Sequence, residues 1–155
     1  FVEMLAMRLE DAGDNVTPAY DGSMCLKKLK ETPIDVVILD IKMPGMDGTQ
    51  VLKVLKERHK YLEIIMLTGH ATIDSAIECT KLGAFKYLEK PYAFEKLVEV
   101  IKEAYKTRLK KKFEHNKHRM EEINKLSFGH SPLGILRALK QHGHFPSRKL
   151  FRLYR

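Results

Sequence analysis

Three residues with reactive side chains each follow an apolar run of this chain. Asp40 follows the run 34–39, Thr68 follows the run 64–67, and Lys90 follows a short apolar and aromatic stretch. Strands of a parallel sheet carry their loops at one edge, so these three side chains should converge. A carboxylate there can act as a nucleophile, while a hydroxyl and an ammonium group hold oxygens on which negative charge develops. That set suits phosphoryl chemistry at an aspartate, although a lone Asp more often merely marks the end of a strand.

The elements that position these residues alternate between helical and strand patterns. The apolar runs, broken only by Asp35, are typical of strands buried on both faces of a parallel sheet. The sequence therefore predicts a doubly wound α/β fold. Pro18 weakens the first strand and places it at a sheet edge. The expected strands are 15–20, 34–39, 64–67 and 85–89, and the expected helices are 1–12, 21–32, 47–59, 72–82 and 92–112, with Asp21, Asp47 or Thr49, and Thr72 as caps.

Composition narrows the class of protein. A hydrophobic content of 44% excludes wholesale disorder. The apolar runs are far shorter than a membrane span, and no signal-peptide pattern opens the chain. Cys25 and Cys79 are the two cysteines and lie outside any CxxC spacing, so they are expected in the core rather than in a disulfide or zinc site. We expect a cytoplasmic protein without a membrane span.

Charge divides the chain in two. Residues 1–105 carry 14 Lys and Arg against 17 Asp and Glu, whereas residues 106–155 carry 14 against 3. The net charges are therefore −3 and +11, which give the overall +8. The pattern predicts an acidic domain followed by a basic tail.

Three motifs in order resemble the receiver domain of bacterial two-component response regulators, over roughly residues 1–108. They are LDIKMPGMDG at 39–48, MLTGHA at 66–71 and GAFKYLEKP at 83–91. The resemblance, to chemotaxis-regulator-like receivers among others, implies a flavodoxin-like sheet with strand order 2-1-3-4-5. It also implies a phosphorelay signalling module, not an enzyme acting on external substrates, whose partner is a sensor histidine kinase.

The resemblance assigns roles to particular residues. Asp40 is similar to the phosphoacceptor that becomes an aspartyl phosphate, and Lys90 to the cation that pairs with the phosphoryl group. Thr68 resembles the switch hydroxyl, and Tyr87 the aromatic that rotates inward when that hydroxyl moves. The peptide bond after Lys90 resembles the family's cis Lys-Pro bond.

Two further positions carry expected roles near the phosphoryl group. The side chains of Lys42 and His70 stand where the family tunes phosphoryl lifetime. The Lys42 backbone carbonyl resembles a ligand of Mg²⁺, together with Asp40. These positions complete the set of site residues that the resemblance implies.

One part of the family pattern falls outside the sequence. Receivers begin with an apolar strand that ends in an acidic pair, and that strand would precede Phe1. Because Mg²⁺ prefers carboxylate oxygens, we expect weak Mg²⁺ binding, poor phosphorylation and reduced stability of a truncated receiver. The absent central strand would leave a gap beside strand 34–39. Residues 150–154 could fill it in principle, but Arg152 argues against a central strand there.

The tail, residues 109–155, shows no familiar output domain. Its pattern is helical through 113–126, breaks at 127–132, gives a short helix at 133–141 and ends as a basic loop. Four histidines, at 115, 118, 142 and 144, have no Cys or acidic partners and indicate surface positions rather than a metal site.

Several outputs remain open. Phosphorylation would reshape the face of residues 72–112, which would bind a downstream protein or a dimer partner. Alternatively, the basic tail binds nucleic acid through charge, with the receiver as its switch. A third alternative is a pseudo-receiver that takes no phosphate and acts as a protein-interaction module.

Overall fold

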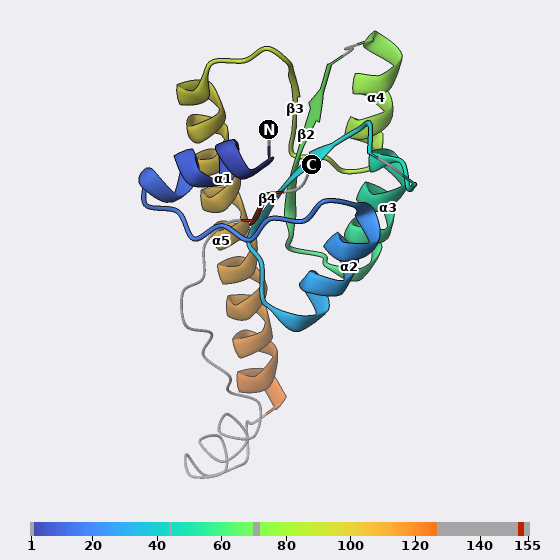
Figure 1. Ribbon diagram of the computed structural model, residues 1–155. Helices are drawn as coiled ribbons and strands as arrows, with labels where there is room; N and C mark the ends of the chain where they lie inside the picture. Colours follow the sequence, from blue (N-terminus) through green and yellow to red (C-terminus); the bar gives the residue numbers. More distant parts are fainter. Residues whose placement is uncertain (1, 44, 70–71, 127–151, 154–155) are drawn as a thin grey trace. The chain divides into compact units, whose positions relative to one another are not determined.

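The computed structural model describes residues 2–43, 45–69, 72–126 and 152–153. Within them lies a four-stranded parallel sheet in the order β3-β2-β1-β4 (Figure 1). The strands are β1 Val36–Asp40, β2 Glu63–Thr68, β3 Lys86–Glu89 and β4 Arg152–Leu153. The helices are α1 Val2–Asp11, α2 Gly22–Glu31, α3 Gly48–Arg58, α4 Ile73–Lys81 and α5 Phe94–Leu126. The predicted doubly wound α/β fold is confirmed.

The sheet is the middle of three layers. Successive side chains of a strand point to opposite faces, and in β1 Val36 and Ile38 join one core while Val37 and Leu39 join the other. All five residues of β1 are buried. Figure 1 shows α1 and α5 on one side of the sheet and α2 and α3 on the other. The apolar runs of the sequence are therefore strands covered by helices on both faces.

Each core combines one face of the sheet with its covering helices. The first contains α1 and α5 side chains, namely Val2, Leu5, Ala6, Leu9, Leu97, Val100, Ile101 and Ala104. The second contains α2, α3 and α4 side chains, namely Cys25, Leu29, Val51, Leu52, Leu55 and Cys79. Both cysteines are free and buried, as expected.

Three helix starts follow the predicted caps. The Asp21 carboxylate accepts a hydrogen bond from the Met24 N–H at 2.7 Å, and the Asp47 carboxylate accepts one from the Thr49 N–H at 2.8 Å. Thr72 opens α4 in a capping box. These side chains satisfy backbone donors that a helix start leaves unpaired.

The expected strand over 15–20 is wrong. Only Ala19 forms an isolated bridge there, and its neighbours are irregular. Pro18 has no N–H to donate to a ladder, and its carbonyl accepts a hydrogen bond from the Lys28 ammonium group instead. This segment therefore forms no regular strand.

The place expected to be empty beside β1 is occupied by β4, which forms an edge of the sheet, so Arg152 does not stand in a central strand. β4 pairs in parallel with β1, with Val37 opposite Arg152 and Ile38 opposite Leu153. The backbone N–H and C=O groups on that edge of β1 need partners because the strand is buried. Two residues of any type other than proline can supply such partners, since the pairing uses backbone atoms. The predicted loop over 143–155 is thus interrupted by a short strand, and its other residues lie outside the described ones.

α5 continues well beyond the predicted end at 112, as the looser pattern over 113–126 suggested. The chain divides into two compact units, the first holding residues 1–108 with β4 and the second beginning at Leu109. In the second unit, large apolar side chains of α5 are exposed: Leu109, Phe113 and Met120. The predicted break at 127–132, the helix at 133–141, and His142 and His144 lie outside the described residues.

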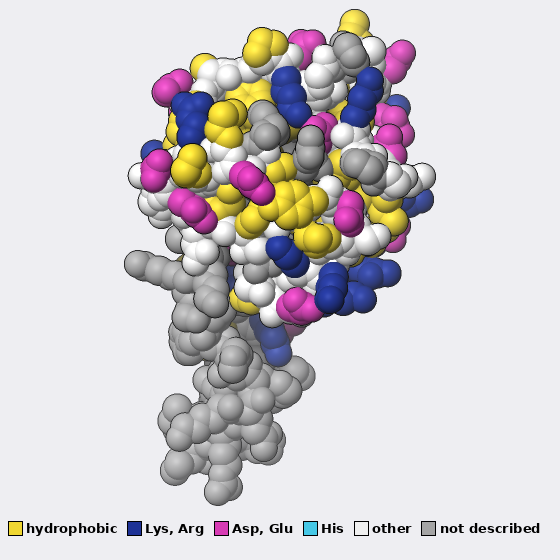
Figure 2. Space-filling view, viewed as in Figure 1, with side chains coloured by type: hydrophobic (Ala, Val, Ile, Leu, Met, Phe, Trp, Pro, Cys, Tyr) yellow, Lys and Arg dark blue, Asp and Glu magenta, His cyan; other side chains and the backbone are white. Residues whose placement is uncertain are grey.

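The surface of the first unit carries charges of both signs. Figure 2 shows Lys and Arg side chains interspersed with Asp and Glu on the face in view, with apolar side chains between them. Among the described helices, none combines the length and apolarity that a membrane crossing requires.

Candidate functional site

The ends of three strands meet at one edge of the sheet, as predicted. Asp40 ends β1 opposite Leu67, and Thr68 ends β2 opposite Glu89. The Lys90 N–H then donates to the Thr68 carbonyl at 2.7 Å. Parallel pairing in this register brings the carboxylate, the hydroxyl and the ammonium group to the same edge.

The Asp40 carboxylate is held by two donors. Lys90 Nζ lies 2.6 Å from Asp40 Oδ2, and the Lys42 N–H donates to Asp40 Oδ1 at 3.1 Å. The side chains of Lys90 and Asp40 are 25% and 13% exposed, so the pair stands at the edge of the core and not in open solvent. A charge-assisted contact of this kind is short and strong. It fixes the carboxylate at the end of β1.

Gly48 shapes the loop that follows Asp40. Its N–H donates to the Ile41 carbonyl at 2.9 Å, which folds the loop back onto the strand end. A Cβ at position 48 would lie 2.2 Å from the Asp40 carbonyl oxygen and 2.7 Å from the Ile41 Cα. No side chain fits that approach, so glycine is required here to seat the Asp40 backbone.

Thr68 and Tyr87 lie in different surroundings. Thr68 is 2% exposed at the end of β2, beside the Asp40 strand. The Tyr87 hydroxyl is 2.8 Å from the Ser75 hydroxyl of α4. The Tyr87 side chain is therefore held at α4, and its hydroxyl pairs with Ser75 and not with Asp40.

The two expected lifetime-tuning positions have different outcomes. The Lys42 side chain is exposed, and this residue contacts Asp40 through its backbone N–H. His70 lies outside the described residues.

The described residues do not by themselves make a magnesium site. Among them, no group of three or more His, Cys, Asp or Glu side chains is arranged to hold a metal ion. Both Asp40 oxygens already accept hydrogen bonds, and the Lys42 carbonyl would add one further oxygen. Mg²⁺ prefers octahedral coordination by oxygen. Asp40 and the Lys42 carbonyl could fill only some of these positions, so water or a bound phosphoryl group would have to supply the others.

Sequence reasoning missed three residues around the site. Gly48 stood in a recognised motif, but its closeness to Asp40 depends on how the loop folds. Ser75, the partner of Tyr87, had a signal in its three-residue spacing from Thr72. Tyr92 had none, because only the packing of α1 against the segment after Lys90 decides where its hydroxyl lies.

Tyr92 follows the Lys90–Pro91 peptide bond, which is cis as expected. The Tyr92 hydroxyl is buried and has no hydrogen-bond partner among the described residues. Burial raises the pKa of Tyr92 to about 12, with a further upward contribution from the Asp40 charge and an opposing one from Arg8. The hydroxyl is therefore protonated, and available as a donor, throughout the physiological pH range.

Comparison with known proteins identifies relatives for the first unit. Residues 1–102 match the model of the response regulator receiver domain. An NtrX-like response regulator of Rickettsia felis is 39% identical over 111 residues, which are 70% of this chain and 23% of that protein. The DNA-binding transcriptional regulator NtrC of Escherichia coli is 38% identical over 101 residues, 65% of this chain and 22% of that protein. The chain thus spans about a quarter of the length of these relatives.

Solved structures of receivers have the same fold. The beryllofluoride-activated NtrC4 receiver domain dimer is 33% identical, with a TM-score of 0.66 over 69% of this chain and 88% of that chain. NtrX from Brucella abortus in complex with ADP is 28% identical, with a TM-score of 0.68 over 90% of this chain and 31% of that chain.

Proposed function

The chain belongs to the response regulator receiver domain family of two-component systems, and on that premise we propose that it accepts a phosphoryl group on Asp40. The observation that carries this proposal is the 2.6 Å contact between Lys90 Nζ and Asp40 at the edge where Thr68 also ends its strand. Receivers are signalling domains rather than enzymes with an external substrate, and this edge fits that role.

The proposed transfer has a simple balance. One carboxylate oxygen of Asp40 attacks the phosphorus of a phosphohistidine on a sensor histidine kinase. The new O–P bond forms as the N–P bond breaks, and the bonding electron pair returns to the imidazole nitrogen, which takes a proton. Asp40 becomes an acyl phosphate, and Lys90 keeps its contact with the anionic group.

Thr68 and Tyr87 would convert this event into a change of surface. The Thr68 hydroxyl turns toward the phosphoryl oxygens, and the Tyr87 ring leaves its contact with Ser75 to follow it. The result is a shift between two populations of the α4–β3–α5 face, to which a protein target or a second copy binds. The Lys42 and His70 side chains would tune how long the phosphoryl group survives.

Metal dependence follows from the donor set. Receiver domains generally bind Mg²⁺ at the phosphorylation site, and Asp40 with the Lys42 carbonyl are the ligands that we propose here. Because these supply few oxygens, we expect weak binding in this chain.

The test uses beryllofluoride, a phosphoryl mimic, with magnesium chloride on the full chain. Amide NMR spectra should shift at Asp40, Thr68, Tyr87 and Lys90 in the wild type and stay unchanged in Asp40→Asn. Asp47→Asn, which changes a carboxylate at a helix cap, is the matched control and should still shift. Shifts that persist in Asp40→Asn, or their absence in the wild type, would contradict the assignment.

The charge of the tail favours a second candidate function. Residues 106–155 carry a net +11, and the exposed face of α5 beyond Arg108 presents several lysines. Phosphate-backbone contacts from such a segment would give binding to DNA or RNA that weakens steeply with salt. NtrC is a DNA-binding regulator, but this chain matches only 22% of it. Binding to a DNA duplex that survives deletion of 109–155 would rule this candidate out.

A further inference from the structure

A buried hydroxyl without a partner among the described residues belongs to Tyr92, two positions after the Lys90 that pairs with Asp40. The accessible surface of Tyr92 Oη is nearly nil, and within the described residues nothing accepts from it or donates to it. Such groups are rare in folded proteins because an unmade hydrogen bond in the interior is unfavourable. The position therefore calls for a physical reason.

The surroundings of this hydroxyl point toward an anion. Tyr92 lines a pocket between α1 and the segment that follows β3, together with Lys90, Arg8 and Phe94. The Arg8 guanidinium group lies 3.9 Å from the centre of the Phe94 ring, which fixes a second cation at the pocket wall. Lys90, Arg8 and Tyr92 thus line one pocket whose other lining residues are apolar, and the Lys90 ammonium group is paired with Asp40.

The Asp40 carboxylate does not satisfy the Tyr92 hydroxyl in this structure. Its oxygens accept from Lys90 and from the Lys42 backbone. A phosphoryl group on Asp40 would add three oxygens further from the strand, with more negative charge than the carboxylate has. New acceptors would then appear next to Lys90, which lines the same pocket as Tyr92, and the Asp40 charge already acts on Tyr92.

We propose that the Tyr92 hydroxyl is a donor reserved for the phosphorylated state, in which it donates a hydrogen bond to an oxygen of the group carried by Asp40. This inference rests on the proposed function and adds to it a residue that the receiver motifs of this sequence do not assign. Tyr92 thus destabilises the resting protein slightly and stabilises the loaded one.

These opposite effects give the test its sign. Tyr92→Phe removes one oxygen atom and keeps the ring in its packing. Without ligand, the variant should melt roughly 2–5 °C higher than the wild type, because an unsatisfied buried hydroxyl is gone. With magnesium chloride, its affinity for beryllofluoride should fall about tenfold, the effect of one hydrogen bond to a charged acceptor. The full chain is titrated by amide NMR in both forms.

Tyr20→Phe is the matched control. Its hydroxyl is exposed and already lies 3.3 Å from Glu3 Oε1, on the connection before α2. Both its melting temperature and its beryllofluoride affinity should stay close to the wild-type values.

The outcomes separate the two proposals. Binding by the wild type with equal affinity in Tyr92→Phe would overturn the role of Tyr92 and leave phosphoryl acceptance standing. A lower melting temperature of Tyr92→Phe without ligand would overturn it too, since the hydroxyl would then have a partner at rest. No binding by the wild type, matching Asp40→Asn, would overturn both.

Discussion

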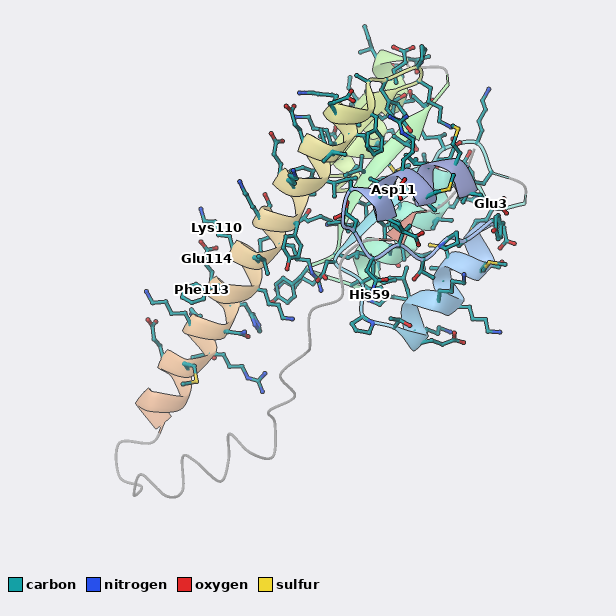
Figure 3. The ribbon with its side chains drawn as sticks, turned by 60° about the vertical axis from the view of Figure 1, so that its left-hand side comes forward. Glu3, Asp11, His59, Lys110, Phe113 and Glu114 are labelled. Atoms are coloured by element: carbon teal, nitrogen blue, oxygen red, sulfur yellow. The ribbon has the colours of Figure 1, made fainter. Side chains whose placement is uncertain are left out.

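The two halves of α5 have the same secondary structure but differ in how deeply their apolar side chains are buried. Up to Arg108 the helix packs on the sheet, and Leu97, Val100 and Ala104 are almost fully buried. In the second half Leu109, Phe113 and Met120 are exposed to solvent, and Figure 3 shows Phe113 projecting from the helix beside Lys110 and Glu114. Helical periodicity alone therefore does not decide whether a residue stabilises the protein. A partner layer does.

The boundary between the halves is marked by a polar contact. Arg108 pairs with Asp35 through its Nε and donates from a terminal nitrogen to the Tyr61 carbonyl at 3.1 Å. Both partners stand just before a strand, at the amino-terminal edge of the sheet. The packed half of α5 is thus fastened at the edge opposite to Asp40.

The largest expected effect tests this comparison within one helix. Leu97 is fully buried and Leu109 is 47% exposed. Leu97→Ala should lower the free energy of unfolding by about 2–5 kcal/mol, whereas Leu109→Ala should change it by no more than about 0.5 kcal/mol. Urea denaturation of both variants measures the difference. Equal losses would mean that the exposed half is packed after all.

A second substitution tests how closely the loop at Gly48 packs against the end of β1 in the first unit. Gly48→Ala places a Cβ against the Asp40 carbonyl and should lower the free energy of unfolding by about 1–3 kcal/mol. Gly69→Ala is the control, because its Cβ would meet nothing within 4 Å. Denaturation midpoints compare the two. A neutral Gly48→Ala would show that the loop moves aside freely.

An ion pair from each of the two compact units gives a third, smaller contrast. Lys90→Met leaves the partly buried Asp40 without its cation and should lower the free energy of unfolding by about 1 kcal/mol at pH 7. Lys110→Met breaks a 3.9 Å pair with Glu114 whose side chains are 78% and 62% exposed, and should cost about 0.3 kcal/mol or less. Added salt should change the difference between these two losses of free energy only slightly. Salt screens the exposed pair most, and that pair contributes little.

The smallest expected effect lies where Arg108 meets the end of α3. Burial lowers the pKa of His59 below 6.5, and the charges of Arg58 and Arg108 lower it further. As the pH falls, His59 is therefore protonated in the unfolded chain before it is protonated in the folded one. The stability that neutral His59 contributes is complete above pH 6.5 and is lost as the pH falls toward the pKa of the folded state. His59→Gln should lose less stability than the wild type between pH 7 and pH 5. Parallel pH profiles of the two proteins would argue against the shift.

The sequence was enough to predict the meeting of Asp40, Thr68 and Lys90, because strand ends are marked by where apolar runs stop. It was also enough for the helix starts at Asp21 and Thr72, where the capping side chain is local. It could not predict β4, since two residues that pair through backbone atoms leave no side-chain pattern. Nor could it predict the buried Tyr92 hydroxyl, whose place depends on α1 packing from far along the chain.

The pairing of β4 with β1 also has a consequence in time. Val37 pairs with Arg152, so this pairing joins two residues that are 115 positions apart in the chain. Closing so long a loop lowers the entropy of the chain before any contact compensates for it. The pairing of β1 with β2 closes a much shorter loop and should form earlier. As the protein leaves the ribosome, its sheet therefore grows first toward β3 and acquires its other edge last.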